Sequence, residues 1–241
     1  RNIHYGWVVA AVTFVTMLAT AGALGAPGVM LRPLEAEFGW KNSDISTAFA
    51  VRLVLFGLMG PFSAALMNRF GVRRVVVTAL FLIIAGFGFS VTMTELWQLM
   101  LFWGLIIGFG TGMTAQVLGA TVATRWFVSR RGLVVGLLTA SNATGQLIFL
   151  PVIAAATEAW GWRVALGLVV ALLAVALVGV LVLMRDRPAD VGLAPMGGTY
   201  QAAPPRTAGL LTLVSAPLLG LRDASRSYVF WVLFVTFFVC G

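Results

Sequence analysis

The sequence has little charge and almost no cysteine or histidine. Only 10% of its 241 residues are charged, 60% are hydrophobic, and the mean hydropathy is +0.99. A soluble domain of this length could not cover so apolar a surface with polar groups. The single cysteine, Cys240, excludes an internal disulfide framework and a multi-cysteine metal site, and we expect neither a metal nor another cofactor. The scarcity of charge therefore indicates a membrane protein.

Three other classes of protein are also disfavoured. The net charge of +8 does not indicate nucleic-acid binding, because the basic residues lie between apolar runs rather than on one groove-reading face. The apolar runs contain no acid–base pair, metal cluster or nucleophile with a partner base, so we do not expect an enzyme. The first apolar run is too long for a secretory signal and no small-residue cleavage site follows it.

Apolar runs long enough to cross a bilayer, which takes about 20 residues as a helix, predict the fold class. We expect an all-α membrane protein with a six-helix N-terminal transmembrane bundle at 1–184. A Pro-, Gly- and Arg-rich stretch at 185–226 is typical of a linker between two bundles. A seventh run makes 227–241 the start of a C-terminal bundle. The six complete runs cover 6–28, 45–67, 75–93, 97–121, 133–156 and 163–184.

The ends of the sequence predict that more chain exists. The first residue is not a methionine, and the seventh run is still apolar where it stops at Gly241. A helix of about 14 residues would not cross a bilayer. We therefore expect this chain to be the N-terminal part of a longer, truncated sequence.

The arginines predict the orientation of the bundle. Positive residues concentrate in the cytoplasmic loops of membrane proteins. Here they gather at the N-terminus, in the loops after the second and fourth runs, and in the linker. We therefore expect a multi-pass protein of the cell (inner or plasma) membrane, with the N-terminus and the 185–226 linker in the cytoplasm. The residues in this set are Arg1, Arg69, Arg73, Arg74, Arg125, Arg130, Arg131, Arg185, Arg187, Arg206, Arg222 and Arg226.

Polar residues inside the runs are distributed unevenly. The third and sixth runs have few, whereas the first, second, fourth and fifth carry hydroxyls, amides and one arginine. Polar groups in hydrocarbon need a partner or a watery cavity. We therefore expect these four helices to surround a cavity while the third and sixth face lipid, which is the layout of half a transporter.

Arg52 is the most informative of these residues. It lies about eight residues, or roughly 12 Å, inside the start of the second run. An arginine at this depth costs from a few to more than ten kcal/mol unless its surroundings compensate, so an anion-binding or gating charge is one interpretation. The alternative is a side chain that extends outward toward Asp44 or Glu37.

Hydroxyl and amide side chains at similar depth are further candidates for an anion site. They could donate hydrogen bonds to a carboxylate. The alternative is that each of them only joins neighbouring helices. The candidates are Thr16, Thr20, Gln116, Asn142 and Gln146.

Small residues at intervals of four predict close helix packing. One such stripe, Gly104, Gly108 and Gly112, lies on the fourth run. A second, on the fifth run, consists of Gly132, Gly136, Ala140 and Thr144.

The stretch "AALMNRFGVRR" at 64–74 resembles the loop between the second and third helices of the major facilitator superfamily. The resemblance implies a cytoplasmic latch between two helix bundles. Asn68 stands where that family has an acid, which puts the charged part of the latch in question. The alternative is that the arginines only set the topology. The residues assigned to the latch are Asn68, Arg69, Gly71, Arg73 and Arg74.

Four more stretches are similar to the monocarboxylate porters and the oxalate:formate antiporter-like proteins of that superfamily. These are "HYGWVV" at 4–9, "GVMLRPLEAEFGW" at 28–40 (a first external loop), "RWFVSRRGLVVGLLTASNATG" at 125–145 and "RPADVGLAPMG" at 187–197. In the third stretch Arg130 and Arg131 match the family's basic pair. The helix-one lysine of the animal porters is missing, because its position falls near Gly25.

This resemblance implies a secondary active transporter that moves a small organic anion, a monocarboxylate or dicarboxylate, by alternating access. The expected partners are the lipid bilayer, the C-terminal bundle of the same protein, and a coupled proton or exchanged anion. Two alternatives stay open: a major facilitator for another substrate class, such as a drug or sugar, and a non-transporting membrane sensor or assembly subunit.

Overall fold

A computed structural model describes residues 4–114, 116–199 and 212–240. The chain divides into two compact units, Arg1–Pro204 and Pro205–Gly241.

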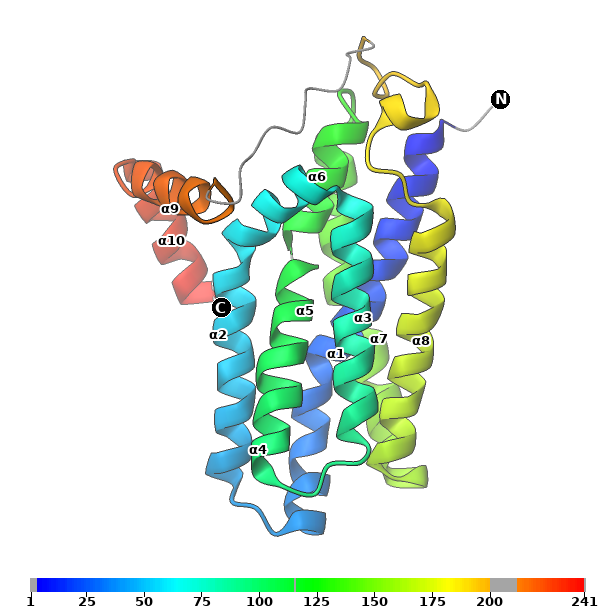
Figure 1. The fold of residues 1–241 in the computed structure, drawn as a ribbon, viewed down its shortest axis with the longest axis vertical. Coiled ribbons are helices and arrows are strands. Elements are labelled where there is room, and N and C mark those ends of the chain that lie inside the picture. Colours follow the sequence, from blue (N-terminus) through cyan, green and yellow to red (C-terminus); the bar gives the residue numbers. More distant parts are fainter. Residues whose placement is uncertain (1–3, 115, 200–211, 241) are drawn as a thin grey trace. The chain divides into compact units, whose positions relative to one another are not determined.

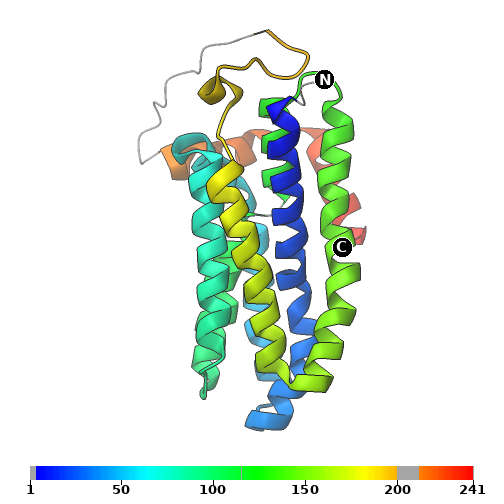
Figure 2. The ribbon, with the colours of Figure 1, turned by 90° about the vertical axis from the view of Figure 1, so that its right-hand side faces the viewer.

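The first unit is a bundle of long helices that run up and down beside one another (Figures 1 and 2). Six helices within the described residues are long and apolar enough to span a membrane, which confirms the predicted all-α membrane fold. The fourth of them is a composite of four segments. The helices are α1 (Tyr5–Phe38), α2 (Asn42–Phe70), α3 (Val72–Ser90), the composite α4 (Leu96–Leu99), η1 (Met100–Ile107), α5 (Gly108–Met113) and α6 (Gln116–Trp126), then α7 (Arg131–Trp160) and α8 (Trp162–Leu183).

Helix α1 is longer than its apolar run. Residues 28–38, expected to form an external loop, continue the helix although Pro27 and Pro33 lie inside it. The helix ends at Phe38 and Gly39 is its C-cap. Gly39 has a φ of 66°, in the left-handed region, and its N–H donates to the Glu35 carbonyl. The polar residues near this end mark where apolar character stops, which is not where the helix stops.

The fourth span departs from a regular α-helix. Residues Met100–Ile107 form a π-helix, and the α-helix that follows ends at Met113 before α6 begins at Gln116. The π-helix lies in the most apolar part of the predicted 97–121 run, where hydropathy does not distinguish it from an α-helix, whereas the break falls beside the polar residues Thr114 and Gln116.

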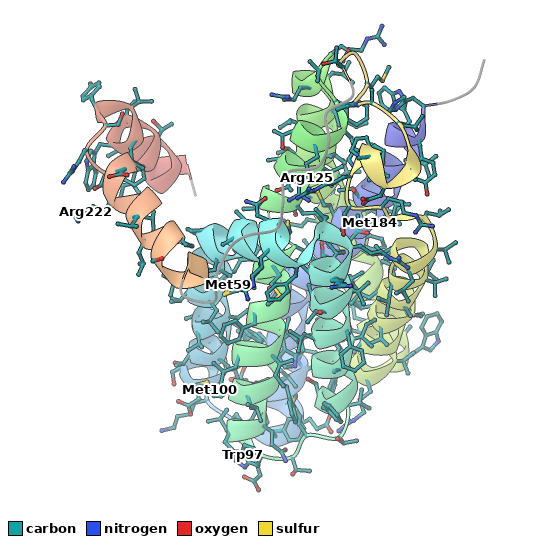
Figure 3. All side chains as sticks on the ribbon, turned by 45° about the horizontal axis from the view of Figure 1, so that its top comes forward. Met59, Trp97, Met100, Arg125, Met184 and Arg222 are labelled. Carbon is teal, nitrogen blue, oxygen red and sulfur yellow. The ribbon has the colours of Figure 1, made fainter. Side chains whose placement is uncertain are left out.

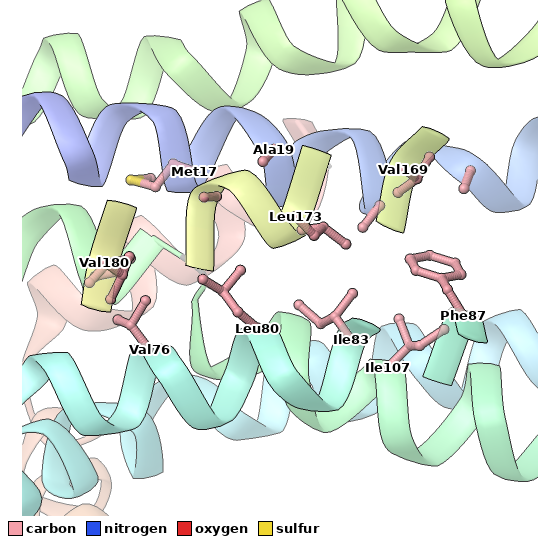
Figure 4. Close-up of a cluster of buried hydrophobic side chains, with 14 of the residues drawn as sticks. Met17, Ala19, Val76, Leu80, Ile83, Phe87, Ile107, Val169, Leu173 and Val180 are labelled. Atoms are coloured by element: carbon pink, nitrogen blue, oxygen red, sulfur yellow. The ribbon is translucent and has the colours of Figure 1, made fainter. Parts of the chain in front are cut away.

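Helix α1 lies at the centre of the packing, in contact with α2, α6, α7 and α8. Helices α3 and α8 pack against each other, and α2 packs against η1 and α5. Leu80 and Ile83 of α3 meet Leu173 of α8 in a buried apolar cluster (Figure 4). By contrast, α2 and α7 bury few of their side chains in this unit.

The first glycine stripe packs as predicted. A Cβ built on Gly108 would lie 3.3 Å from the Arg52 Cα, and one on Gly112 would lie 2.6 Å from the Met59 Cβ, so α5 and α2 meet along this face. The second stripe does not pack in this unit, because Gly132 and Gly136 have no atom within 4 Å of an added Cβ. The close approach of α7 to α1 occurs instead at Gly145.

The second unit contains α9 (Thr212–Ala224) and α10 (Tyr228–Cys240). Helix α9 lies within the stretch expected to be a linker. The Trp231 indole N–H donates to the Ser225 carbonyl at 2.7 Å, across the turn between the two helices.

Candidate functional site

Arg52 lies in the interior of the first unit, on the face of α2 that meets α1 and α5. Its exposed fraction is 1%. Its Nη2 donates a hydrogen bond of 2.8 Å to the Ala23 carbonyl of α1. Its Nε is buried and has no hydrogen-bond partner among the described residues. The guanidinium is therefore held by one neutral dipole and retains an unused donor.

The acceptor for Arg52 exists because of a proline. In a regular α-helix the Ala23 carbonyl would accept from the N–H four residues later, but that residue is Pro27, which has no N–H. The freed carbonyl is the one that Arg52 uses. Pro27 was not among the predicted site residues, although a proline inside an apolar helical run is a signal in the sequence.

Arg52 does not pair with Glu37, one of the two acids toward which the alternative interpretation would extend its side chain. Glu37 forms an ion pair with Arg163 at 2.7 Å and accepts from the Trp162 indole at 2.5 Å. Arg163 also donates to the Val91 carbonyl at 3.1 Å. These contacts join the end of α1, the end of α3 and the start of α8. No local pattern pointed to them, because Glu37 and Trp162 are 125 residues apart in sequence.

Thr16 and Thr20 are buried in α1, with exposed fractions of 0% and 4%. The Thr16 hydroxyl donates to the Val12 carbonyl at 2.8 Å, and that of Thr20 donates to the Thr16 carbonyl at 3.0 Å. Thr20 lies one turn before Ala23. Both donors are satisfied within the helix, so what these hydroxyls can still offer in this arrangement is their acceptor lone pairs.

Asn142 and Gln146 lie together on α7. The Gln146 Nε2 donates to the Asn142 Oδ1 at 3.3 Å, with Asn142 half-buried and Gln146 exposed. Gly145, on the same turn, lies against the Leu18 carbonyl of α1. The pair thus lies on the surface of the unit beside the α1–α7 contact. The side chain of Gln116 lies outside the described residues.

The turn between α2 and α3 is bound to the rest of the bundle at one end, which we call the basic end. This end comprises the start of α1, the α2–α3 and α6–α7 turns, and residues 184–198. Arg125 of α6 donates from Nη2 to the Asn68 Oδ1 at 2.8 Å and to the Met67 carbonyl at 3.2 Å. The amide at position 68 therefore has an arginine partner inside the same bundle.

Asp186, just after α8, supports the other side of this turn. Its Oδ1 accepts from the Arg73 backbone N–H at 2.8 Å, so it caps the N-terminus of α3. Gly71 has a φ of 94°, and a Cβ there would collide with the Asp186 carboxylate. The Arg73 guanidinium donates to the Leu181 carbonyl.

The two remaining latch arginines differ in their surroundings. The Arg69 guanidinium lies 5.3 Å from the centroid of the Phe70 ring, and Arg74 is exposed.

Residues 184–198 bind the other helix ends at the basic end. The Met196 backbone donates to the Trp126 carbonyl at 2.9 Å and accepts from Val128 and Ser129 at 3.0 and 3.1 Å. The Tyr5 hydroxyl donates to the Leu183 carbonyl at 2.8 Å. Figure 3 shows Arg125 and Met184 near this end and Trp97 at the other. Residues 184–198, which include the 187–197 segment, thus cover the basic end and bind its helix ends; we call these residues the clasp.

The family basic pair begins α7. Arg130 is its N-cap, with a φ of 60°, and is exposed. Arg131 donates from Nε to the Phe127 carbonyl at 3.1 Å. The pair therefore lies at the basic end, in the α6–α7 turn. Among the described residues, no group of three His, Cys, Asp or Glu side chains could hold a metal ion.

Comparison with known families settles what this bundle belongs to. The family model of the Major Facilitator Superfamily matches residues 9–241. The chain belongs to this superfamily. The major facilitator assignment agrees with the all-α membrane fold of this unit.

Among curated relatives, this major facilitator chain is similar to several monocarboxylate transporters. It is 34% identical to human monocarboxylate transporter 11 over 163 residues, which is 67% of this chain and 34% of that protein. It is 28% identical to mouse monocarboxylate transporter 9 over 147 residues, 60% of this chain and 28% of that protein. The chain thus spans about a third of the length of the curated relatives it matches.

Proposed function

We propose that this chain is the first half of a secondary active transporter that moves a small organic anion, a monocarboxylate or dicarboxylate, by alternating access. The observation that carries the proposal is Arg52, a buried guanidinium whose recorded partner is a neutral carbonyl and whose Nε is unused. The names of the relatives support the same class of substrate.

The electrostatics of Arg52 favour an anion as its ligand. A positive charge among apolar helices is unfavourable unless it is compensated, and a carbonyl dipole compensates it only in part. Within the described residues no carboxylate pairs with Arg52. The planar guanidinium binds a carboxylate with two parallel hydrogen bonds, so a small organic acid would supply the missing charge.

Other parts of the site are assigned by the same proposal. Asn142 and Gln146, together with Gln116, are donors on neighbouring spans. Thr16 and Thr20 of α1 belong to the same proposed site, where each would turn its hydroxyl from a helical carbonyl to the anion. A C-terminal bundle of the same protein would supply the other wall, with a coupled proton or an exchanged anion driving transport. Asn68 and the arginines of the α2–α3 turn form the latch, and Arg130 and Arg131 mark the entry into α7.

The proposed membrane arrangement follows from the arginines. The basic end faces the cytoplasm of a cell membrane, because positive loops are retained there. In this arrangement the opposite end, with the Glu37–Arg163 pair, faces outside.

The test is uptake of labelled lactate, pyruvate, formate and oxalate by the complete protein in proteoliposomes. The variants are Arg52→Gln, Arg52→Lys and, as a matched control, Arg32→Gln, which removes an exposed arginine of α1. We expect saturable uptake of at least one acid, unchanged in Arg32→Gln. It should fall tenfold or more in Arg52→Gln, since a charged hydrogen bond contributes about 1.5–3 kcal/mol.

Two outcomes would contradict the proposal in different ways. Saturable uptake that survives Arg52→Gln would keep the organic acid as substrate and remove Arg52 from the site. Absence of uptake of all four acids, with the protein correctly inserted, would point to another substrate class within the superfamily.

A further inference from the structure

Helix α1 contains two prolines that offer a natural comparison. Pro27 removes the helical donor from the Ala23 carbonyl, and Pro33 removes it from the Val29 carbonyl. Within the described residues, Arg52 donates a hydrogen bond to the Ala23 carbonyl, whereas no arginine donates to the Val29 carbonyl. The pairing of a freed carbonyl with the one buried arginine of α2 is therefore specific to Pro27.

We propose that Pro27 is a positioning residue for Arg52, and that the Ala23 carbonyl is an internal acceptor which the transported anion replaces. The second part rests on the proposed function, because it needs an anion that binds Arg52. The first part requires only the hydrogen bond between Arg52 and the Ala23 carbonyl.

The physical reason is competition for Nη2. A carboxylate that forms two parallel hydrogen bonds through the unused Nε also takes the adjacent Nη2, the atom that donates to the Ala23 carbonyl. With no anion bound, Arg52 needs an acceptor in an apolar interior, and a carbonyl without its helical partner is the best one that a neighbouring helix can offer. A carboxylate is a stronger acceptor for a guanidinium than a carbonyl is. Binding of the anion would therefore exchange one acceptor for the other.

This exchange would also change how two helices are joined. The Arg52–Ala23 hydrogen bond links α2 to α1, and Gly108 of α5 lies directly against the Arg52 backbone. When the anion takes over the guanidinium, this link is lost and the Ala23 carbonyl is left without a donor. The occupied and empty proteins thus differ in a contact between α1 and α2, and a ligand can shift a conformational equilibrium through such a difference.

The first part is tested by thermal unfolding of the complete protein without any anion. Pro27→Ala and, as the matched control, Pro33→Ala are each made in the wild type and in Arg52→Gln. Each alanine restores a helical N–H, which should stabilise α1. In the wild type, however, Pro27→Ala also gives Arg52 a competitor for its acceptor.

We expect Pro33→Ala to raise the unfolding temperature equally in both backgrounds. Pro27→Ala should raise it less in the wild type than in Arg52→Gln, by about 3 °C. Equal increments for Pro27→Ala in the two backgrounds would overturn the positioning role.

The second part is tested by the apparent dissociation constant of an anion, measured from the rise in unfolding temperature as its concentration increases. The probe is whichever of lactate, pyruvate, formate and oxalate gives the strongest saturable uptake. Pro27→Ala should tighten binding about tenfold because it weakens the competing acceptor, whereas Pro33→Ala should leave binding within about twofold of the wild type.

Unchanged or weaker binding in Pro27→Ala would overturn the displacement of the carbonyl by the anion. Absence of uptake of all four acids would overturn the proposed function and the displacement together. The unfolding comparison would still decide whether Pro27 positions Arg52, so the two failures are distinguishable.

Discussion

At the scale of single residues, position 68 shows how a neutral amide can bind a turn to a neighbouring helix. Asn68 accepts from Arg125 of α6, which also donates to the Met67 carbonyl at the end of α2. The α2–α3 turn is therefore bound within the bundle without a charge at position 68.

This pair predicts opposite effects for two substitutions. Asn68→Asp should make the contact with Arg125 ionic and stabilise the protein by at most about 1 kcal/mol, because the pair is exposed. Asn68→Ala should destabilise it by about 1 kcal/mol by removing the acceptor. Thermal unfolding at low and high salt checks both. The gain in Asn68→Asp should shrink at high salt, and a gain that is insensitive to salt would contradict an ionic origin.

How far single residues could be predicted depended on whether their partners were local. Arg52 was recognisable from sequence because an arginine within an apolar run is costly wherever it points. Its acceptor was not, because the Ala23 carbonyl is a backbone group on another helix, 29 residues away. The alternative interpretation, an outward side chain toward Asp44 or Glu37, missed the partner of Glu37 for the same reason, since Arg163 reaches Glu37 from much later in the chain.

At the scale of helices, α7 contains two glycines with opposite surroundings. A Cβ at Gly145 would lie 2.6 Å from the Leu18 carbonyl oxygen and 2.7 Å from the Ala21 Cβ of α1, whereas Gly136 has open space. Gly145→Ala must push α1 and α7 apart.

We expect Gly145→Ala to destabilise the protein by about 1–3 kcal/mol through overpacking. Gly136→Ala should be neutral or stabilise by up to about 1 kcal/mol through helix propensity. Denaturation of both variants in the same detergent measures the difference. Equal stability of the two would mean that α1 and α7 do not meet at Gly145.

Helix α3 depends on a cap from outside its own segment. Asp186 accepts from the Arg73 N–H, whereas Asp190 accepts from the Arg187 N–H within its own short turn. Asp186→Ala should therefore lower the free energy of unfolding by about 1–2 kcal/mol, and Asp190→Ala by less. Hydrogen exchange of the first turn of α3 should accelerate in Asp186→Ala alone. Equal exchange in the two variants would show that α3 does not need this cap.

The existence of the helices followed from hydropathy, but their ends and contacts did not. Apolar character stops near residue 28, whereas α1 continues to Phe38, because backbone hydrogen bonds and not hydropathy hold its last turns. Spacing alone could not say which small-residue stripe is buried. The stripe of Gly104, Gly108 and Gly112 packs on α2, whereas Gly132 and Gly136 do not pack in this unit.

At the scale of the whole molecule, the orientation in the membrane is open to a direct test. Thr199, the residue that follows the basic end, and Ser43 at the other end are both exposed, and Cys240 is the one cysteine of this sequence. In a Cys240→Ser background, a membrane-impermeant thiol reagent added to intact cells should label Ser43→Cys and not Thr199→Cys. After permeabilisation both should react. The reverse pattern in intact cells would place the basic end outside.

The clasp over the basic end has a consequence for the timing of synthesis. The His4 Nε2 lies 3.1 Å from the Ala194 carbonyl oxygen, 190 positions later in the sequence, and the Tyr5 hydroxyl donates to the Leu183 carbonyl, 178 positions later. At a synthesis rate of about 5–20 residues per second, the start of α1 would wait on the order of 10–40 s for these partners. During that interval the ribosome and the insertion machinery hold an unfinished bundle whose basic end is open. Substitutions in 184–198 should therefore reduce the yield of inserted protein by a larger factor than the one expected from the change that they cause in the free energy of unfolding of the mature protein.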